Sequence, residues 1–125
     1  MTMEKKIIRG KRILLVDDEA SIRGSFRMML EIDDHVVTEA NNGAEAMDLF
    51  ANGLFDLVAT DFEMPVIKGN ELALRIKQLA PKQPILMITA YGKYLGDSEN
   101  PVDSILNKPI KLDDLRRAIA KLLSN

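Results

Sequence analysis

The sequence predicts one doubly wound α/β domain, in which helices cover both faces of a parallel sheet. Strand and helix patterns alternate five times along the 125 residues, which is typical of strand–helix–strand units. Two strand segments, residues 13–16 and 85–88, are apolar throughout, as expected for strands buried on both faces. We assign residues 1–11 to a basic leader and residues 12–125 to the folded domain, whose length suits one core.

The composition excludes several classes of function. Hydrophobic residues make up 46% of the chain and charged residues 29%, as in ordinary globular proteins. The net charge of −2 predicts no general attraction to nucleic acid or to an acidic membrane. The lack of cysteine excludes thiolate chemistry, and a single histidine argues against a histidine-rich metal site. Because no segment reads as a signal peptide or a membrane span, we expect a cytoplasmic protein.

The first half of the chain contains two strand–helix units. A strand over residues 13–16 is followed by apolar residues at helical spacing, which predict a helix over residues 20–31. A shorter strand over residues 36–40 ends at the turn signal Asn41-Asn42-Gly43. The second helix is marked by the apolar residues Ala46, Met47, Leu49 and Phe50 and stops at Asn52-Gly53.

The second half continues the alternation with one weak segment. An apolar run over residues 57–60 leads to Asp61, and Pro65 ends any regular continuation. The remaining predicted elements are a helix over residues 72–79, a strand over 85–88, a short strand over 105–106 and a helix over 112–123. Between residues 91 and 104 few apolar residues recur at helical spacing, so we expect a fourth helix there to be short or irregular.

Polar residues follow the predicted strands at the points where the strands end. Parallel strands place their carboxyl ends on one edge of the sheet, which is where open α/β sheets bind ligands. The residues that reach this edge are Asp17, Asp18, Asp61, Thr89 and Lys108. Each one separately has an ordinary explanation, such as a turn cap. Together, three acids, a hydroxyl and a lysine indicate a reactive site.

The three carboxylates need a compensating charge. At about 5 Å, each ionised pair would repel by about 3 kcal/mol in an effective dielectric of about 20. Oxygen ligands without histidine or cysteine favour a hard cation such as Mg²⁺. A lysine ammonium and a threonine hydroxyl suit a transferring phosphoryl group, and one carboxylate could act as the nucleophile. These residue types indicate Mg²⁺-dependent phosphoryl acceptance on an aspartate.

Taken together, these motifs resemble those of receiver domains of two-component response regulators, of the chemotaxis-regulator type. The resemblance covers the chain from Lys11 to its end, in the family's order and spacing. It rests on Asp17-Asp18, Asp61 with Met64-Pro65, Gly69, Thr89-Ala90 and Lys108-Pro109. It implies a flavodoxin-like fold, with a five-stranded parallel sheet in the order 2-1-3-4-5.

The resemblance also implies roles for single residues. Asp61 would be the phosphoacceptor and a metal ligand, and would receive phosphate from a histidine kinase or a phosphotransfer protein. Asp18 would bind Mg²⁺ directly and Asp17 through a metal-bound water. The other implied roles are metal ligation by the Glu63 backbone carbonyl, phosphate contact by Lys108, a switch hydroxyl on Thr89 and a cis Lys108–Pro109 bond.

Three features depart from the family pattern. The usual switch aromatic is replaced by Ile105, so that an aromatic switch cannot operate unchanged, and Tyr91 is a candidate substitute. The 19 positions from Thr89 to Lys108 are somewhat few for the family. Glu63 and Tyr91 match the two positions that, in the family it resembles, flank the path of the hydrolytic water, and we expect them to lengthen the lifetime of the acyl phosphate.

The leading interpretation is a signalling switch and not an enzyme by role. It implies a downstream protein target or output domain, no direct binding to nucleic acid or membrane, and a monomer or weak dimer. Both a standalone regulator and a receiver from a longer protein fit the sequence. Ile105 and the irregular segment leave open a receiver-like interaction module that needs no phosphorylation. A haloacid-dehalogenase-type phosphohydrolase also uses an aspartate nucleophile, but places it after the first strand and not the third.

Overall fold

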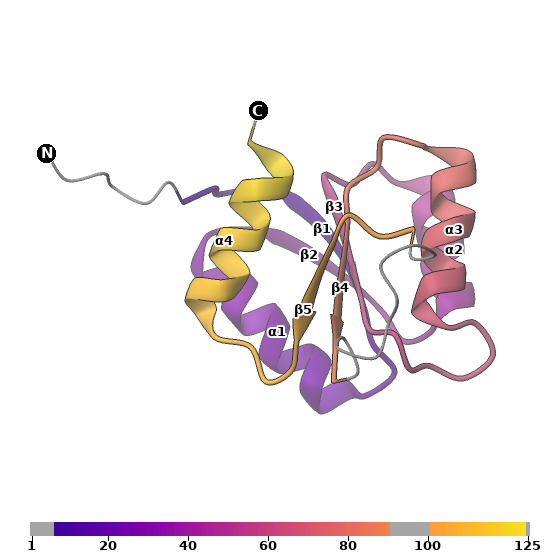
Figure 1. The fold of residues 1–125 in the computed structure, drawn as a ribbon, viewed down its shortest axis with the longest axis horizontal. Coiled ribbons are helices and arrows are strands. Elements are labelled where there is room, and N and C mark those ends of the chain that lie inside the picture. Colours follow the sequence, from indigo (N-terminus) through magenta and orange to yellow (C-terminus); the bar gives the residue numbers. More distant parts are fainter. Residues whose placement is uncertain (1–6, 91–100, 125) are drawn as a thin grey trace, which may run out of the picture.

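Five parallel strands form one sheet in the order β2-β1-β3-β4-β5 in the computed structural model, which describes residues 7–90 and 101–124. The strands are β1 (Arg12–Val16), β2 (Val36–Ala40), β3 (Leu57–Thr60), β4 (Ile85–Thr89) and β5 (Ser104–Asn107). The helices of the described ranges are α1 (Ala20–Ile32), α2 (Gly43–Asn52), α3 (Gly69–Leu79) and α4 (Leu112–Leu123). The predicted doubly wound fold and its strand order are confirmed (Figure 1).

Side chains that alternate along the strands build two apolar layers. In β1, Ile13 and Leu15 pack with residues of α1 and α4, whereas Leu14 and Val16 pack with residues of α2 and α3. Figure 1 shows α1 and α4 on one face of the sheet and α2 and α3 on the other. All four of these β1 side chains are at most 1% exposed, which explains why this strand is apolar throughout.

Helix α2 begins at Gly43, three residues before the first apolar residue of the predicted pattern. The polar residues before it act as a helix cap and not only as a turn. The Asn42 side chain accepts a hydrogen bond from the Glu45 N–H at 2.8 Å, and the Glu45 carboxylate accepts one from the Asn41 N–H. These reciprocal bonds satisfy N–H groups that the first helical turn leaves free.

The connection between β4 and β5 is described only at its two ends. The short or irregular helix that the sequence predicts there falls mainly on residues 91–100, which lie outside the described residues. Just before β5, the Asp103 carboxylate accepts hydrogen bonds from the Ile85 N–H at 2.8 Å and from Lys77 Nζ at 2.7 Å. Asp103 therefore links the start of β5 to the start of β4 and to α3 by hydrogen bonds.

The residues just before β1 are tied to the connection between α1 and β2. The Gly10 N–H donates to the Asp33 carbonyl at 3.1 Å, and the Lys11 N–H donates to His35 Nδ1 at 3.0 Å. His35 is buried, and burial lowers the pKa of its imidazole. The neutral ring can therefore accept the hydrogen bond from Lys11.

A buried ion pair joins the end of α1 to α4. Asp33 is 3% exposed, and its two carboxylate oxygens accept hydrogen bonds from Arg116 Nε and Nη2, both at 2.9 Å. These hydrogen bonds from Arg116 hold the pKa of Asp33 below its usual value, against the effect of burial. This bidentate pair fixes the C-terminal helix against the rest of the domain.

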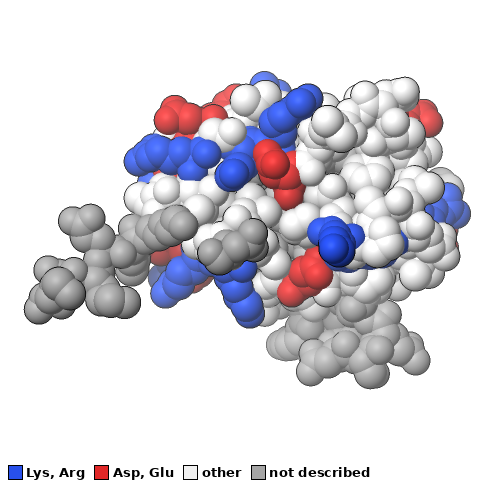
Figure 2. All heavy atoms as spheres, turned by 90° about the horizontal axis from the view of Figure 1, so that it is seen from above, with Lys and Arg blue, Asp and Glu red and all other residues white. Residues whose placement is uncertain are grey.

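Charged side chains are mixed in sign on the face shown in Figure 2, which lies towards the C-terminal end of α4. Blue and red groups alternate there with uncharged surface, so the described part of this face carries no continuous basic patch. Such a patch is what a nucleic-acid backbone usually binds. Within the described ranges, no helix combines the length and apolar character that a bilayer crossing requires.

We predict that Asp33→Asn lowers the free energy of unfolding by about 2 kcal/mol at neutral pH, because it removes the negative charge that faces Arg116 and replaces one of the two acceptor oxygens by an NH₂ group. The depressed pKa of Asp33 means that this stabilisation is present above the ordinary aspartate pKa and is lost as pH falls through the depressed value. Urea unfolding of both proteins across the acid range should therefore give curves that converge in acid.

The control is Asp114→Asn, which breaks an exposed pair with Arg117 on α4. It should cost less than about 0.5 kcal/mol. Equal stability of Asp33→Asn and the unmodified protein at neutral pH would contradict the assignment.

Candidate functional site

The expected site residues all lie where strands end, on the same edge of the sheet. Asp17 and Asp18 follow β1, Asp61 follows β3, Thr89 ends β4 and Lys108 follows β5. In the sheet register, Val16 lies beside Thr60 and Thr89 beside Asn107, so the neighbouring strands end at similar levels. The hydrophobic sheet therefore positions a ring of polar groups on short loops.

Three carboxylates converge at this edge. Asp17, Asp18 and Asp61 each offer one oxygen, and these oxygens all lie within 4.8 Å of one another. Asp17 is 2% exposed and Asp61 9%, whereas Asp18 is exposed to solvent. The cluster is thus buried on one side and open on the other, as a site needs to be if an ion or a phosphoryl group is to enter.

Lys108 supplies positive charge to the cluster. Its Nζ lies 3.2 Å from Asp17 Oδ2 and 3.4 Å from Asp61 Oδ1. The ammonium group is also 5.8 Å from the centroid of the Phe26 ring, which favours a cation at its face. Lys108 therefore bridges the two buried acids and reduces their mutual repulsion.

Asp61 is the acid whose protonation the site alters most clearly. Burial is the largest influence and raises the pKa of Asp61 above its ordinary value. Lys108 lowers this pKa, whereas the Asp17 carboxylate raises it further. Burial together with Asp17 outweighs Lys108, so a second cation would favour the ionised form.

The donor set fits a divalent hard cation. The converging side-chain ligands are carboxylate oxygens, which Mg²⁺ and Ca²⁺ prefer over nitrogen or sulfur. The positive charge of Lys108 does not match the three carboxylates, so a divalent ion would complete the charge balance. The exposed Asp18 gives such an ion a route in from solvent.

The loop after β3 folds back against the backbone of Asp61. The Phe62 N–H donates to Asp61 Oδ1 at 2.8 Å, and the Gly69 N–H donates to the Phe62 carbonyl at 2.9 Å. A Cβ atom at Gly69 would lie 2.0 Å from the Asp61 carbonyl oxygen, which is far inside any allowed contact. Glycine is therefore required where α3 begins, because the helix meets the site backbone there.

Backbone strain in this loop is concentrated at Val66. Its φ is +70°, and the Ile67 N–H donates to the Pro65 carbonyl at 2.8 Å across it, which forms a γ-turn of a rare and strained type. Met64 and Ile67 on either side are buried, whereas Val66 is 98% exposed. The two buried neighbours hold the loop in place and turn Val66 to solvent.

Glu63 forms an ion pair away from the acid cluster. Its carboxylate binds Lys68 Nζ, and both side chains are about half exposed, at 45% and 53%. Lys68 also lies 5.4 Å from the centroid of the Phe62 ring. The Glu63 side chain is thus held by a partner five residues along the chain.

The expected switch residues are described in part. Thr89 is fully buried, and its carbonyl accepts the Lys108 N–H at 2.9 Å, beside a Lys108–Pro109 peptide bond that is cis. Ile105 is half-buried in β5, next to Met87 of β4. Tyr91 lies outside the described residues, so its role remains a prediction from the sequence.

Arg23 is a residue at this edge that the sequence pattern did not predict. Its guanidinium donates to the backbone carbonyl of Asp17 at 2.6 Å. In the sequence it is only one cation on an amphipathic helix, where a solvated side chain is the usual outcome. A possible signal is its position one turn into the helix that follows the paired acids.

Comparison with known proteins gives one consistent result. Residues 13–120 match the family model described as the response regulator receiver domain. The chain is 37% identical over 116 residues to the response regulator receiver protein CpdR of Brucella abortus (strain 2308), covering 90% of this chain and 97% of that one. It is 34% identical over 115 residues to the response regulator MprA of Mycobacterium sp. (strain KMS), again covering 90% of this chain. The chain spans about half the length of MprA, 50%.

Solved structures agree in fold. The response regulator TrrA from Thermotoga maritima, in complex with Mg²⁺-BeF, has a TM-score of 0.85 and 38% identity and covers 90% of this chain and 99% of its own. A second structure shows TrrA in complex with the histidine kinase ThkA, with a TM-score of 0.84 and coverage of 91% of this chain and 99% of that one.

We predict opposite effects for two alanine substitutions. Gly69→Ala should lower the free energy of unfolding by about 2 kcal/mol or more, because the new methyl group must displace the Asp61 backbone. Gly24→Ala should raise it by about 1 kcal/mol, because Gly24 lies inside α1 with open space around its Cβ position.

Chemical denaturation of the two variants beside the unmodified protein checks both signs. A Gly69→Ala protein of unchanged stability would show that the loop after β3 adjusts freely, contrary to the packing described.

Proposed function

Because the chain belongs to the family of response regulator receiver domains, we propose that it is a Mg²⁺-dependent phosphoacceptor whose Asp61 receives a phosphoryl group. The observation that carries this proposal is the convergence of Asp61 with Asp17, Asp18 and Lys108 at one edge of the sheet. The acids, a cation and a route from solvent are the parts that such a transfer needs.

The acids would hold the metal ion. In this proposal Asp18 binds Mg²⁺ directly, Asp17 binds it through water, and Asp61 and the backbone carbonyl of Glu63 complete the protein ligands. Mg²⁺ would supply positive charge to the phosphoryl oxygens. Asp18 is the exposed member of the cluster, which suits a ligand that meets the incoming ion.

Asp61 would act as the nucleophile. An ionised Asp61 oxygen attacks the phosphorus atom, an O–P bond forms, and the bond from phosphorus to the histidine nitrogen of the donor breaks, with its electron pair staying on nitrogen. Lys108, 3.4 Å from Asp61 Oδ1, would turn from that carboxylate to a phosphoryl oxygen as charge arrives. The Phe62 N–H already donates to Asp61 Oδ1 and orients the carboxyl group.

The response would begin at Thr89 and Lys108. The phosphoryl group adds a charge of about −1.5 to −2 within a site that is already acidic, and this favours a rearrangement of the surrounding loops. Thr89 would donate its hydroxyl to a phosphoryl oxygen. Ile105 occupies the position of the usual switch aromatic, so the change must be transmitted by an aliphatic side chain or by Tyr91.

The partners are inferred from chemistry and from the relatives. A histidine kinase or a phosphotransfer protein is the proposed donor, supported by the structure of TrrA with the histidine kinase ThkA. A downstream target is proposed because a switch acts only through a partner that it controls. The relatives allow either an attached output domain or a separate target protein, since MprA extends beyond the matched half whereas CpdR is matched over 97% of its length. We further propose a cytoplasmic monomer or weak dimer that transfers and slowly loses phosphate but does not turn over free substrates.

We predict that acetyl phosphate with Mg²⁺ labels the protein once, at Asp61. Asp61→Asn should abolish labelling because it removes the nucleophile. Removal of Mg²⁺ with EDTA should also abolish labelling, because the negative charges of the acids and of the phosphoryl group are then no longer balanced. Intact-protein mass spectrometry and phosphate-affinity gels measure the modified fraction.

Asp56→Asn is the matched control, because Asp56 is an aspartate before β3 whose carboxylate accepts the Arg12 N–H at 2.8 Å, outside the acid cluster. Labelling of Asp61→Asn at the rate of the unmodified protein would refute the proposal. Repeated turnover of small phosphate esters would support a phosphohydrolase instead.

We predict that Glu63→Asn shortens the lifetime of the phosphorylated form several-fold. Glu63 lies two residues after Asp61 and is held by Lys68, and we propose that its side chain hinders the approach of the hydrolytic water. The decay of label after removal of the phosphodonor measures the lifetime. Glu71→Gln, which breaks an exposed ion pair with Arg75 on α3, should leave the decay unchanged. Equal decay of Glu63→Asn and the unmodified protein would remove this role.

A further inference from the structure

Arg23 contacts two loops beside the acid cluster although it belongs to a surface helix. Its side chain is only 14% exposed. Its Nη1 donates to the Asp17 carbonyl at 2.6 Å and to the Asn41 side-chain oxygen at 3.2 Å, and its Nε donates to Glu39 Oε1 at 2.8 Å. One side chain therefore joins α1, the end of β1 and the end of β2.

The bond to Asp17 acts on the peptide group between the two neighbouring acids. That carbonyl belongs to the planar unit that links Asp17 to Asp18, so its orientation sets the direction in which Asp18 leaves the chain. Within residues 7–90 and 101–124, no hydrogen bond or ion pair holds the Asp18 carboxylate itself. The position of this carboxylate therefore depends on the backbone on either side of it.

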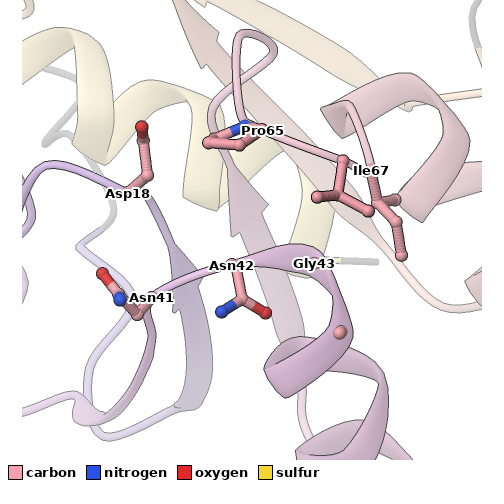
Figure 3. A pocket seen from close by; sticks show the side chains of 8 residues that line it. Asp18, Asn41, Asn42, Gly43, Pro65 and Ile67 are labelled. Atoms are coloured by element: carbon pink, nitrogen blue, oxygen red, sulfur yellow. The ribbon is translucent and has the colours of Figure 1, made fainter.

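The backbone that flanks Asp18 is held by two further hydrogen bonds. The Glu19 N–H donates to Asp17 Oδ1 at 2.9 Å, and the Asp17 N–H donates to the Ala40 carbonyl at 3.2 Å. Arg23 adds the bond that orients the peptide between them. Figure 3 shows Asp18 and Asn41 on neighbouring loops beside the same hollow, and Arg23 bridges these two loops.

We propose that Arg23 is a positioning residue for the divalent-cation site, which presents the Asp18 carboxylate to the ion by holding the Asp17–Asp18 peptide against the end of β2. The inference rests on the proposed role of the acid cluster as a Mg²⁺ site. Outer groups that orient metal ligands in this way are needed for full metal affinity.

Glu39 explains how a positive side chain can lie so close to a cation site. Hydrogen bonds from Arg27 and Arg23 hold the pKa of Glu39 below its usual value, so this carboxylate is ionised at neutral pH. It compensates the guanidinium charge of Arg23 locally. Arg23 can therefore donate its hydrogen bond to the Asp17 carbonyl while its positive charge repels a bound divalent cation only weakly.

Arg27 provides a matched control. It also donates to Glu39, and it belongs to the same helix, but its other partner is Glu31 on α1 and not the acid loop. A purely structural role, in which arginines fasten α1 to β2 through Glu39, would give Arg23 and Arg27 similar effects. A positioning role predicts that only the substitution of Arg23 weakens Mg²⁺ binding.

The test compares Arg23→Met with Arg27→Met by calorimetric titration of Mg²⁺ without any phosphodonor. Arg23→Met should weaken Mg²⁺ binding about tenfold, whereas Arg27→Met should change it by less than about twofold. In acetyl-phosphate labelling, the Mg²⁺ concentration for half-maximal rate should rise by the same factor for Arg23→Met, with the maximal rate at saturating Mg²⁺ retained. Thermal unfolding in EDTA shows that both variants are folded.

Each outcome bears on one proposal. Mg²⁺ affinity of folded Arg23→Met equal to that of the unmodified protein, or equal weakening by Arg27→Met, overturns the positioning role. If Arg23→Met does not fold, Arg23→Gln replaces it, because its shorter, neutral side chain cannot span from α1 to the Asp17 carbonyl as the guanidinium does. Unchanged Mg²⁺ affinity in that variant has the same meaning. An unmodified protein that binds no Mg²⁺ and is not labelled at Asp61 refutes the proposed function itself.

Discussion

The structure depends on a balance of charge at the carboxyl edge of the sheet. Burial and the neighbouring Asp17 raise the pKa of Asp61, and Lys108 only partly offsets them. The acids are thus held in a state that a further cation would relieve. The apolar layers on both faces of β1 and β3 enforce this arrangement, because they exclude water from the strands that carry Asp17 and Asp61.

This balance also distinguishes the competing functions. A haloacid-dehalogenase-type phosphohydrolase would place its nucleophile after the first strand, whereas Asp61 follows β3, the third strand of the chain and the central strand of the sheet. A receiver-like module that needs no phosphorylation would have no need to keep Lys108 between two buried acids.

The fold and the centre of the site could be predicted because both follow from short-range patterns. Apolar runs identified the strands, and the residue after each strand had to reach the same edge, so Asp17, Asp61 and Lys108 were found together. Contacts that depend on side-chain direction could not be predicted. Arg23 and Asp33 look like surface charges in the sequence, and only tertiary packing turns one towards the Asp17 carbonyl and buries the other beside Arg116. The capping of α2 by Asn42 could be predicted only in part, since the same residues signal either a turn or the start of a helix.

The acids of the site lie at strand ends, and in the described part of the chain Arg23 of α1 is the helix residue whose side chain donates a hydrogen bond to their backbone. The residues that form the acid cluster and the residues on the helix surfaces are therefore largely separate sets of positions. Substitutions on the helix surfaces can therefore accumulate while the strand ends preserve the arrangement of the acids.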